Sequence, residues 1–595
     1  MAASPSHSAE VDQPTLDSVG STESCEVKSV SQDEVILPRD AVSDASLPST
    51  ELVDQHADVK QSDTMHSTDD GNALSGRDLF LVLGSLSISF FLGALDNTIV
   101  STALTRIAYD FHEFESVSWV ATVYLLAGSS LQPIYGKLAD IFGGKNTYLF
   151  SMAIFLVGSV ISGAAQSMSM LIGARLIQGI GAAGMMDLPM VLLVKLVGVQ
   201  QSSKYMGVFG MMFALASAIG PLLGGVFTDK VSWRWSFYIN VPLVVPGIIL
   251  TMIFLVLPEV RTSFMAKLRR IDWLGSLTFV SAVVCFLLAT LWGGHVHAWN
   301  SAVIIALYVV SVVLCGIFFF IEAKVAVEPI MPLGLYRSLN YTLSSLIAFV
   351  FGIFFFGLIF VIPIFFQAVR GESAIQAGLQ LLPFLIPLAL TVTLSGMVVS
   401  KTGSYRPFIL LGSIISTLGS GLLILLDQHS SPGMSAGFLV ICGIGAGFSF
   451  QTSIIAAQAT LVPQDMSSGT TLIAFFRTIG GVIGVAIFSA IQLNIIQESL
   501  SGLPNGAVLI ETANKGIEFI STLSPEDQKI IGVAYGEAFH KVFIAMTPLT
   551  GIMILLTLGL KHIELTPQAS AASTPTPLNA EEGMKNEKES DMSPV

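Results

Sequence analysis

The chain has 595 residues, of which 52% are hydrophobic and only 12% are charged, and its formal net charge is −14. Charged residues make up about 25% of a soluble globular protein, so this composition excludes an ordinary soluble domain and indicates a membrane protein. The negative charge lies at the ends: residues 1–76 carry 15 acidic and 3 basic side chains, and residues 561–595 carry 6 and 3. The stretch between them is close to neutral, so we expect neither a basic protein partner nor a nucleic-acid partner.

Both ends are predicted to be disordered tails. Residues 1–76 are rich in Ser, Asp, Glu and Val and show neither the helical nor the strand period of apolar residues. Residues 561–595 are rich in Ser, Thr, Pro and Glu. Such segments bury too little apolar surface to offset the entropy that ordering would cost.

Fourteen segments between the tails are long and apolar enough to cross a bilayer, which requires about 20 mostly apolar residues. Because lipid offers no hydrogen-bond partners, each span must satisfy its own backbone and is predicted to be a helix. The sequence therefore predicts an all-α polytopic membrane protein. The predicted spans are 79–107, 118–135, 147–165, 168–194, 205–227, 237–257, 274–291, 302–321, 343–366, 379–399, 407–426, 434–457, 472–491 and 541–560.

The basic residues of the short loops predict the orientation. Lys and Arg are more frequent in the loops that share a side with residues 1–76, and such loops are normally cytosolic. An even number of spans then places both termini in the cytosol. We expect a multi-pass protein of the plasma membrane, with a vacuolar or vesicular membrane as the alternative.

Two loops repeat a glycine pattern. Gly136 and Gly143 follow the second span, Gly396 and Gly403 follow the tenth, and both loops end in basic residues. Glycine suits tight turns and places where two backbones approach closely. Equivalence of these loops predicts two six-helix bundles separated by two additional spans. The expected parts are an N-terminal bundle at 77–257, a two-helix linker at 258–335 and a C-terminal bundle at 336–560.

These and other motifs resemble the major facilitator superfamily. The loop containing Gly136, Asp140, Gly143 and Lys145 is similar to the family's signature between helices 2 and 3, although Ile141 and Gly144 stand where basic residues are usual. Residues 171–181 resemble its helix 4 motif. In the fifth span, the glycine-rich antiporter motif of drug exporters is matched by Gly220, Pro221, Gly224 and Gly225.

Further segments narrow the resemblance to one branch. Residues 95–100, 233–242 and 271–275 are similar to the fourteen-helix drug:proton antiporters, and residues 363–371 and 476–481 resemble fungal toxin-efflux members. The resemblance implies the major facilitator fold and proton-driven export of hydrophobic small molecules by alternating access. It implies no cofactor besides the proton gradient, and we expect a monomer with a lipophilic small-molecule substrate.

Few charged residues lie inside the spans, where each costs about 2.5–3.5 kcal/mol on insertion scales. Asp96 in the first span and Arg175 in the fourth lie at depths that agree within a few Å, at a rise of 1.5 Å per residue. They are therefore predicted to meet. Two roles fit the pair: a carboxylate that exchanges protons or binds substrate beside an arginine, or a static ion pair between two helices.

Two further charged residues lie inside the predicted spans. Asp187 lies in the inner half of the fourth span, two residues before Pro189. It is either a second protonation site or a group that contacts water at the inner mouth. Arg477 begins the glycine-rich thirteenth span, and its side chain either extends to the membrane surface or contacts substrate.

The glycines of the fifth span predict close helix packing. Gly220, Gly224 and Gly225 remove side chains on neighbouring turns, and Pro221 bends the helix. We expect either a pliable seam between the two bundles or ordinary glycine packing. Residues that could line a substrate cavity are Asn97, Trp119, Gln178, Gln367 and Gln451, together with Phe90, Phe91, Phe365 and Phe366.

The preferred function is proton-coupled efflux of toxins, secondary metabolites or drugs. A nutrient, siderophore or vacuolar basic amino-acid transporter is the nearest alternative, and a non-transporting membrane sensor is an alternative of another class. The sequence contains no phosphate-binding G-x-x-x-x-G-K-[ST] motif, which argues against an ATP-driven pump, and no Cys/His cluster that would indicate a metal site. We do not expect an enzyme.

Overall fold

A computed structural model describes residues 76–113, 116–257, 262–294, 296–515, 523–563 and 565. The described residues all belong to one compact unit. The predicted tails lie almost entirely outside the described residues, so their disorder stays a prediction.

The described residues fold into helices and short 3-10 turns, without a strand. The helices are α1 (Gly76–Ile99), α2 (Leu104–Phe111), α3 (Ser118–Phe142), α4 (Gly144–Gly163), α5 (Met168–Lys230), α6 (Trp235–Tyr238), α7 (Asn240–Phe254), α8 (Phe264–Arg269), α9 (Trp273–Trp292), α10 (Ala302–Lys324), α11 (Leu339–Arg370), α12 (Ala374–Leu379), α13 (Leu382–Thr402), α14 (Arg406–Leu423), α15 (Pro432–Gln458), α16 (Met466–Ser501), α17 (Gly506–Lys515) and α19 (Pro525–Leu558).

Within the described ranges, 12 helices are long and apolar enough to cross a membrane. Two predicted spans, the fourth and the fifth, lie in α5, which Gly198 interrupts with a φ of 78°. The predicted second span lies in α3, which has 25 residues but carries many polar side chains and is not among the 12. The multi-pass architecture is confirmed, whereas the count of fourteen stays a prediction.

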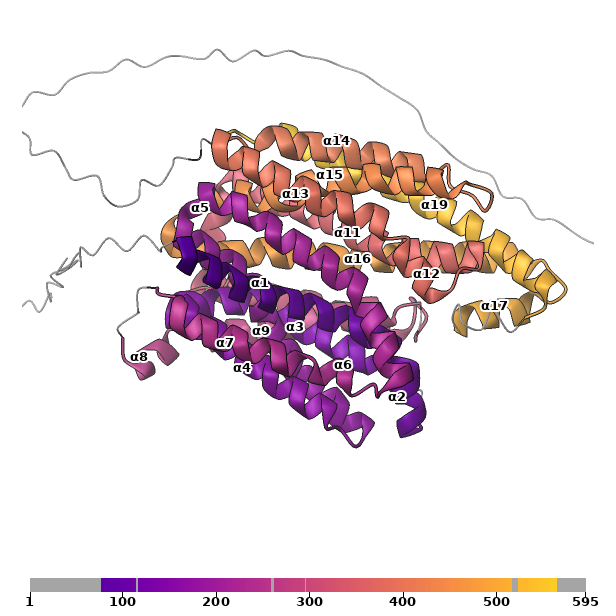
Figure 1. Cartoon of the computed structure of the whole chain (residues 1–595), viewed down its shortest axis with the longest axis horizontal. Helices are drawn as coiled ribbons and strands as arrows, with labels where there is room; N and C mark the ends of the chain where they lie inside the picture. The colour runs from indigo at the N-terminus through magenta and orange to yellow at the C-terminus, as the bar shows by residue number, and fades with distance from the viewer. Residues whose placement is uncertain are drawn as a thin grey trace, which may run out of the picture. The chain divides into compact units, whose positions relative to one another are not determined.

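The helices form two groups that meet along two pairs of neighbours. Figure 1 shows α1, α3, α4 and α7 together on one side and α11, α13, α14, α15 and α19 on the other. Between the groups, α3 packs on α16 and α5 packs on α13. The two additional helices α9 and α10 pack on each other, and α9 also contacts α3 and α16.

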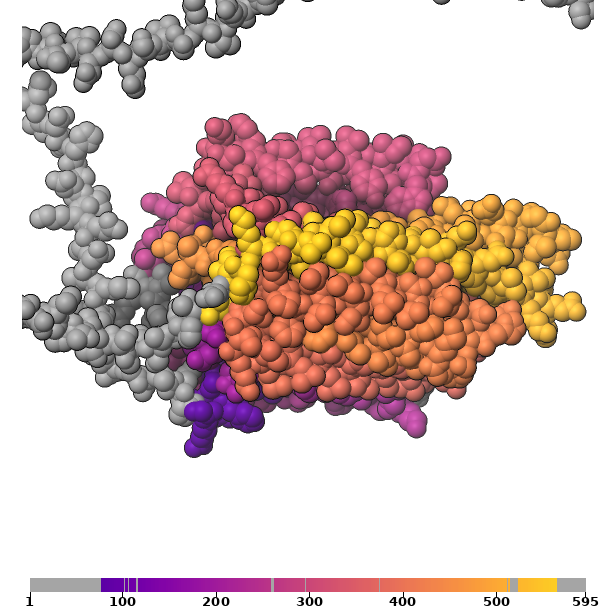
Figure 2. All heavy atoms as spheres, turned by 90° about the horizontal axis from the view of Figure 1, so that it is seen from above, coloured from indigo at the N-terminus to yellow at the C-terminus, as the bar shows by residue number. Residues whose placement is uncertain are grey.

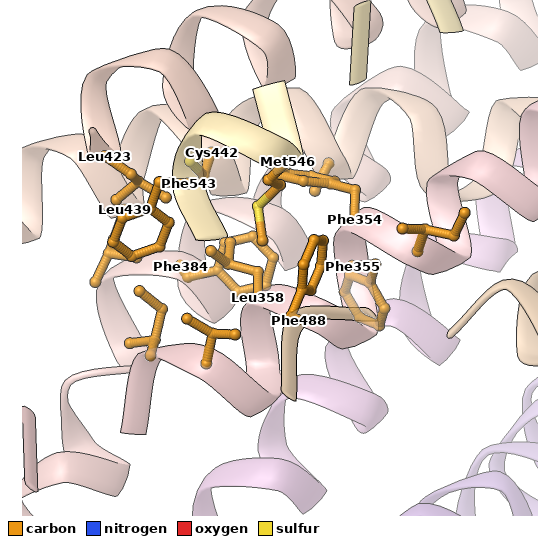
Figure 3. Close-up of a cluster of buried hydrophobic side chains, with 14 of the residues drawn as sticks. Phe354, Phe355, Leu358, Phe384, Leu423, Leu439, Cys442, Phe488, Phe543 and Met546 are labelled. Carbon is orange, nitrogen blue, oxygen red and sulfur yellow. The ribbon is translucent and has the colours of Figure 1, made fainter. Parts of the chain in front are cut away.

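Apolar side chains lie both in the protein core and on the protein surface. Inside the C-terminal group, aromatic and aliphatic side chains from several helices fill a continuous core (Figure 3). On the surface, α10 lies at one edge of the molecule (Figure 2), and only 22% of its most apolar 18 residues are buried. The exposed apolar face of α10 is what a lipid-facing helix requires.

The repeated glycines occupy equivalent places. Gly143 and Gly403 follow the ends of α3 and α13 with φ values of 91° and 67°, a conformation that side chains disfavour. Gly136 and Gly396 each precede them by two turns and lie against the opposite group. A Cβ at Gly136 would overlap the Thr471 hydroxyl of α16, and one at Gly396 would overlap the Ser203 carbonyl of α5. Both pairs of helices therefore approach closely at the Gly143–Gly403 end, which the sequence predicts to be cytosolic.

The fifth-span glycines correct one expectation. Gly220 and Gly224 face Thr98 and Ile99 of α1, inside the N-terminal group, so they do not form a seam between the groups. Gly225 has no atom within 4 Å of its added Cβ. Gly207 and Gly210 of α5 do face the other group: their Cβ atoms would lie 2.6 Å from Thr393 Cα and 3.2 Å from Val392 Cγ1 of α13. The rotation of α5 about its own axis determines which neighbouring helix each glycine contacts. The glycine motif in the sequence does not indicate this rotation.

Candidate functional site

Asp96 of α1 and Arg175 of α5 form a buried ion pair. An Nη1–H of Arg175 donates to Asp96 Oδ2, and its Nε–H donates to the Val120 carbonyl at 3.0 Å. The exposed fractions of the two side chains are 0% and 1%. The guanidinium also stacks over the Tyr124 ring, 4.0 Å from its centroid. The predicted meeting of Asp96 and Arg175 is therefore confirmed, whereas its role stays open.

Two amides complete this network. Gln178, one turn after Arg175, donates to Asp96 Oδ1 at 2.6 Å, and Asn240 at the start of α7 donates to the same oxygen at 3.0 Å. Both amides also donate to Ser159 Oγ of α4, at 2.9 and 3.2 Å. Asp96 thus accepts from three side chains, so its charge is well compensated. Gln178 belongs to this network and does not line the cavity described next.

A cavity of about 110 Å³ lies between the two groups of helices. Side chains from α1, α3 and α5 form one wall, and side chains from α11, α15 and α16 form the other. Most of the lining is aromatic or small. The lining residues are Phe90, Asn97, Tyr124, Leu125, Gly128, Ser129, Gln132, Ala182, Ala183, Met186, Asp187, Phe213, Phe355, Phe356, Phe450, Arg477 and Thr478.

Asp187 and Arg477 bring opposite charges to this cavity from opposite groups. Asp187 lies on α5 and Arg477 on α16. Asp187 Oδ2 and Arg477 Nη1 are buried and have no hydrogen-bond partner. The Arg477 guanidinium lies over the Phe450 ring, 4.6 Å from the centroid. The expectation that Arg477 extends to the membrane surface is wrong, because its side chain lines the cavity, whereas the role of Asp187 stays a prediction.

Of the other residues predicted to line the cavity, some do line it and others pack elsewhere. Asn97 and Phe90 line the cavity. Trp119 packs against Trp292 of α9, with ring centroids 5.5 Å apart, because its face of α3 meets the additional helices. Gln451 is buried beside the lining residue Phe450, and neither of its amide atoms has a partner.

The remaining candidates lie elsewhere. Gln367 donates to the Pro363 carbonyl of its own helix at 3.3 Å. Phe365 and Phe366 are buried in the C-terminal core, where the Arg370 guanidinium lies over both rings. Phe91 packs against the core of the N-terminal group. These side chains face the inside of a bundle, so apolar composition alone did not identify cavity walls.

Three polar cavity residues were missed from the sequence. Ser129 and Gln132 are one turn apart on α3, and Thr478 follows Arg477 on α16. Gln132 Oε1 is buried without a partner. Polar residues spaced by three positions inside an apolar helix form a stripe, and that spacing could have indicated the cavity face.

The last turn of α3 and the start of α4 carry a polar network that reaches the other group. Asp140 accepts from Lys195 Nζ of α5 at 3.3 Å and from Ser468 Oγ of α16 at 2.8 Å. Lys145 Nζ donates to the Met252 carbonyl of α7 at 2.9 Å. The motif thus keeps a charge network despite the missing basic residues, and one of its bonds crosses to the other group.

A second acidic residue joins the linker to the same end of α3. Glu328, between α10 and α11, lies 3.1 Å from Lys137 Nζ and accepts from Arg270 at 2.5 and 3.1 Å. Burial raises the pKa of the Glu328 carboxyl, but the hydrogen bonds from Arg270 and Lys137 outweigh it, so the pKa lies below its ordinary value.

Comparisons with known proteins agree with this architecture. The family model of the Major Facilitator Superfamily matches residues 86–485. An MFS-type efflux pump of Arthroderma benhamiae is 32% identical over 498 residues, covering 82% of this chain and 92% of that protein. The efflux pump aflT of Aspergillus parasiticus is 34% identical over 496 residues, covering 82% and 96%.

Similarity extends to a bacterial protein and a solved structure. Multidrug resistance protein 3 of Bacillus subtilis is 35% identical over 427 residues, covering 72% of this chain and 82% of that protein. The crystal structure of the human organic anion transporter MFSD10 has a TM-score of 0.51 at 11% identity, covering 81% of this chain and 99% of that one. At such low identity the structural match concerns the fold alone.

Proposed function

Because this chain belongs to the Major Facilitator Superfamily, we propose that it exports hydrophobic small molecules in exchange for protons. Its relatives of 32–35% identity include proteins named as efflux pumps and a multidrug resistance protein. The chain is accordingly a membrane transporter and not an enzyme. We place it in the plasma membrane as a monomer with both termini in the cytosol.

The observation that carries the proposal is the cavity between the two groups of helices. Five phenylalanines and Tyr124 make its walls suited to an apolar, aromatic ligand. Phe213 of one group and Phe355 of the other have ring centroids 5.7 Å apart, so the cavity is formed by both groups jointly. A relative movement of the groups would therefore change its shape and its access.

The close contacts at the Gly143–Gly403 end support alternating access. There, α3 packs on α16 at Gly136 and α5 packs on α13 at Gly396. Because glycine has no side chain, the helices approach closely at both places. The Asp140–Ser468 hydrogen bond adds a polar link across the same junction. Opening this end to admit substrate from the cytosol would separate both helix pairs and break that bond, and closing it would restore them.

Proton coupling requires an ionisable group whose protonation competes with substrate. Two clusters inside the membrane core contain a carboxylate and an arginine: Asp96 with Arg175, and Asp187 with Arg477. Either carboxylate could take up a proton.

The proposal is tested in proteoliposomes that contain the purified full-length protein. An imposed pH gradient should drive flux of lipophilic aromatic compounds against their concentration gradient, and an ionophore that collapses the pH gradient should abolish this accumulation. Flux that follows only the substrate gradient, unchanged by the pH gradient, would contradict proton-coupled efflux. A panel of lipophilic toxins and basic amino acids distinguishes export from nutrient transport.

A further inference from the structure

Two buried carboxylates, Asp96 and Asp187, have opposite surroundings. Asp96 accepts hydrogen bonds from Arg175, Gln178 and Asn240. Asp187 lines the cavity, and its Oδ2 is buried without a hydrogen-bond partner. A compensated carboxylate resists protonation because a proton would displace its donors, whereas an uncompensated one has a free site for a proton or a ligand.

Access also differs between the two groups. Asp96 has an exposed fraction of 0% and is not among the residues that line the cavity. Tyr124 does line the cavity, and its ring carries the stacked guanidinium of Arg175. The Tyr124 hydroxyl donates to the Gly93 carbonyl of α1 at 3.2 Å, which fixes the ring in place. A ligand in the cavity therefore touches Asp187 directly but meets Tyr124 before it reaches the Asp96 network.

Arg477 supplies the charge that faces Asp187. Of the residues that line the cavity, Tyr124, Asp187 and Arg477 are the titratable or charged ones. Behind the wall, Asp96 and Arg175 compensate each other. Because Arg477 belongs to the other group of helices, its attraction to an ionised Asp187 acts across the boundary that must move during transport.

We propose that Asp187 is the carboxylate that exchanges its proton for substrate, with Arg477 as its partner across the two groups, while Asp96 and Arg175 position the helices. This assignment rests on the proposed function. It also indicates the substrate class: a neutral aromatic molecule with a hydrogen-bond donor for Asp187 Oδ2 and a neighbouring acceptor for Arg477 Nη1. Such a molecule would stack on the aromatic walls and satisfy both buried polar atoms.

The exchange needs no covalent chemistry. With Asp187 protonated, the Asp187–Arg477 pair carries one positive charge. A substrate N–H or O–H that donates to Asp187 Oδ2 binds the carboxylate more strongly than the neutral carboxyl, so binding favours loss of the proton to water and the charge of the pair becomes zero. Re-protonation of Oδ2 places a hydrogen on the oxygen that accepted the substrate's donor, so substrate binding weakens and the substrate dissociates. Proton and substrate thus compete for one oxygen, which is the condition for antiport.

The test measures proton release on ligand binding by purified full-length protein in lipid nanodiscs, with a pH-indicator dye in weakly buffered solution. The probe is 2-quinolinone, an aromatic lactam with adjacent N–H and C=O groups. Its control is 1-methyl-2-quinolinone, which lacks the donor. We expect wild type to bind 2-quinolinone at least tenfold more tightly than the control and to release up to one proton per ligand, in a pH-dependent manner.

Four variants locate the proton. Asp187→Asn should release none and should lose the discrimination between the probes, whereas Asp187→Glu should retain release with a shifted pH profile. Asp96→Asn should retain release. Arg477→Gln should weaken binding of both probes, because both keep the carbonyl. Gel filtration and thermal unfolding establish which variants are folded, and the carboxylate-retaining Asp187→Glu keeps the assignment testable where Asp187→Asn does not fold.

The outcomes separate this assignment from the proposed function. If wild-type flux is driven by a pH gradient but Asp187→Asn releases protons like wild type, or Asp96→Asn alone abolishes release, the assignment to Asp187 is wrong. If wild type does not distinguish the two probes, the substrate class is wrong. If wild-type flux ignores the pH gradient and no ligand of the efflux panel releases protons, the proposed antiport fails as a whole.

Discussion

Gly136 of α3 lies directly against Thr471 of α16, so closely that a Cβ at position 136 would overlap the threonine hydroxyl. The same Cβ would lie 3.0 Å from the Ser467 carbonyl oxygen and 3.0 Å from Ser468 Cα. Backbone atoms cannot move aside as a flexible side chain can. The contact between the two groups at this end therefore depends on the absence of a side chain at Gly136.

We predict that Gly136→Val reduces transport at least tenfold, because the branched side chain holds α3 and α16 apart and disfavours the state closed at the Gly143–Gly403 end. Distances between spin labels on α3 and α16 should lengthen. Gly225→Val is the matched control, since nothing lies within 4 Å of its added Cβ. Equal transport by the two variants would remove Gly136 from the closing contact.

Gly224 should affect folding more than movement. Its Cβ would overlap the Ile99 carbonyl and the Thr102 hydroxyl, which belong to the same group of helices. Gly224→Leu is expected to lower stability by about 1–3 kcal/mol, the usual cost of overpacking. Thermal unfolding of the purified variant measures this effect, with Gly225→Leu as the control. If Gly224→Leu has normal stability but does not transport, Gly224 would instead have a role in conformational change.

Asp96→Asn should destabilise the protein by about 3–5 kcal/mol, because it leaves the buried Arg175 charge without its anion. The double variant Asp96→Asn with Arg175→Gln removes both charges and should recover part of the loss. A double-mutant cycle from thermal unfolding gives the coupling energy. Additive effects of the two substitutions would show that the pair contributes nothing as a pair.

Some of this arrangement followed from the sequence because local rules determine it. The depth of Asp96 and Arg175 along their helices depends only on the rise per residue, and the two side chains do meet. The spacing of Gly136 from Gly143 and of Gly396 from Gly403 is about two turns of one helix, which the sequence separation alone determines. The backbone shows the turn and the close approach that the glycines predicted.

Other features depend on how helices rotate and pair, which no local pattern reports. Asp187 and Arg477 are far apart in the chain, and only the packing of α5 and α16 brings both to one cavity. Gly220 faces Thr98 of α1, whereas Ser203 and Gly207 of the same helix face α13 of the other group. Trp119 packs on α9 because the additional helices contact α3 there, a contact that its aromatic character could not indicate.

The linker contact through Glu328 should depend on pH. The pKa of Glu328 is lowered in the folded protein, so the carboxyl stabilises the contact above the pKa of the unfolded chain. This contribution is lost as the pH falls through the lower, folded value. At neutral pH Glu328 should therefore hold Lys137 and Arg270 together, and below about pH 4, near the ordinary pKa of Glu, it should progressively release them.

We predict that Glu328→Gln lowers thermal stability at pH 7 by no more than about 1 kcal/mol, as partly exposed ion pairs do, and that the difference from wild type shrinks under acidic conditions. Thermal unfolding at a series of pH values measures both. Glu113→Gln is the control, since Glu113 is exposed and has no ion pair in the described part of the chain. A Glu328→Gln deficit that persists unchanged at acidic pH would mean that the side chain acts through packing, because protonated Glu and Gln would then differ for reasons other than charge.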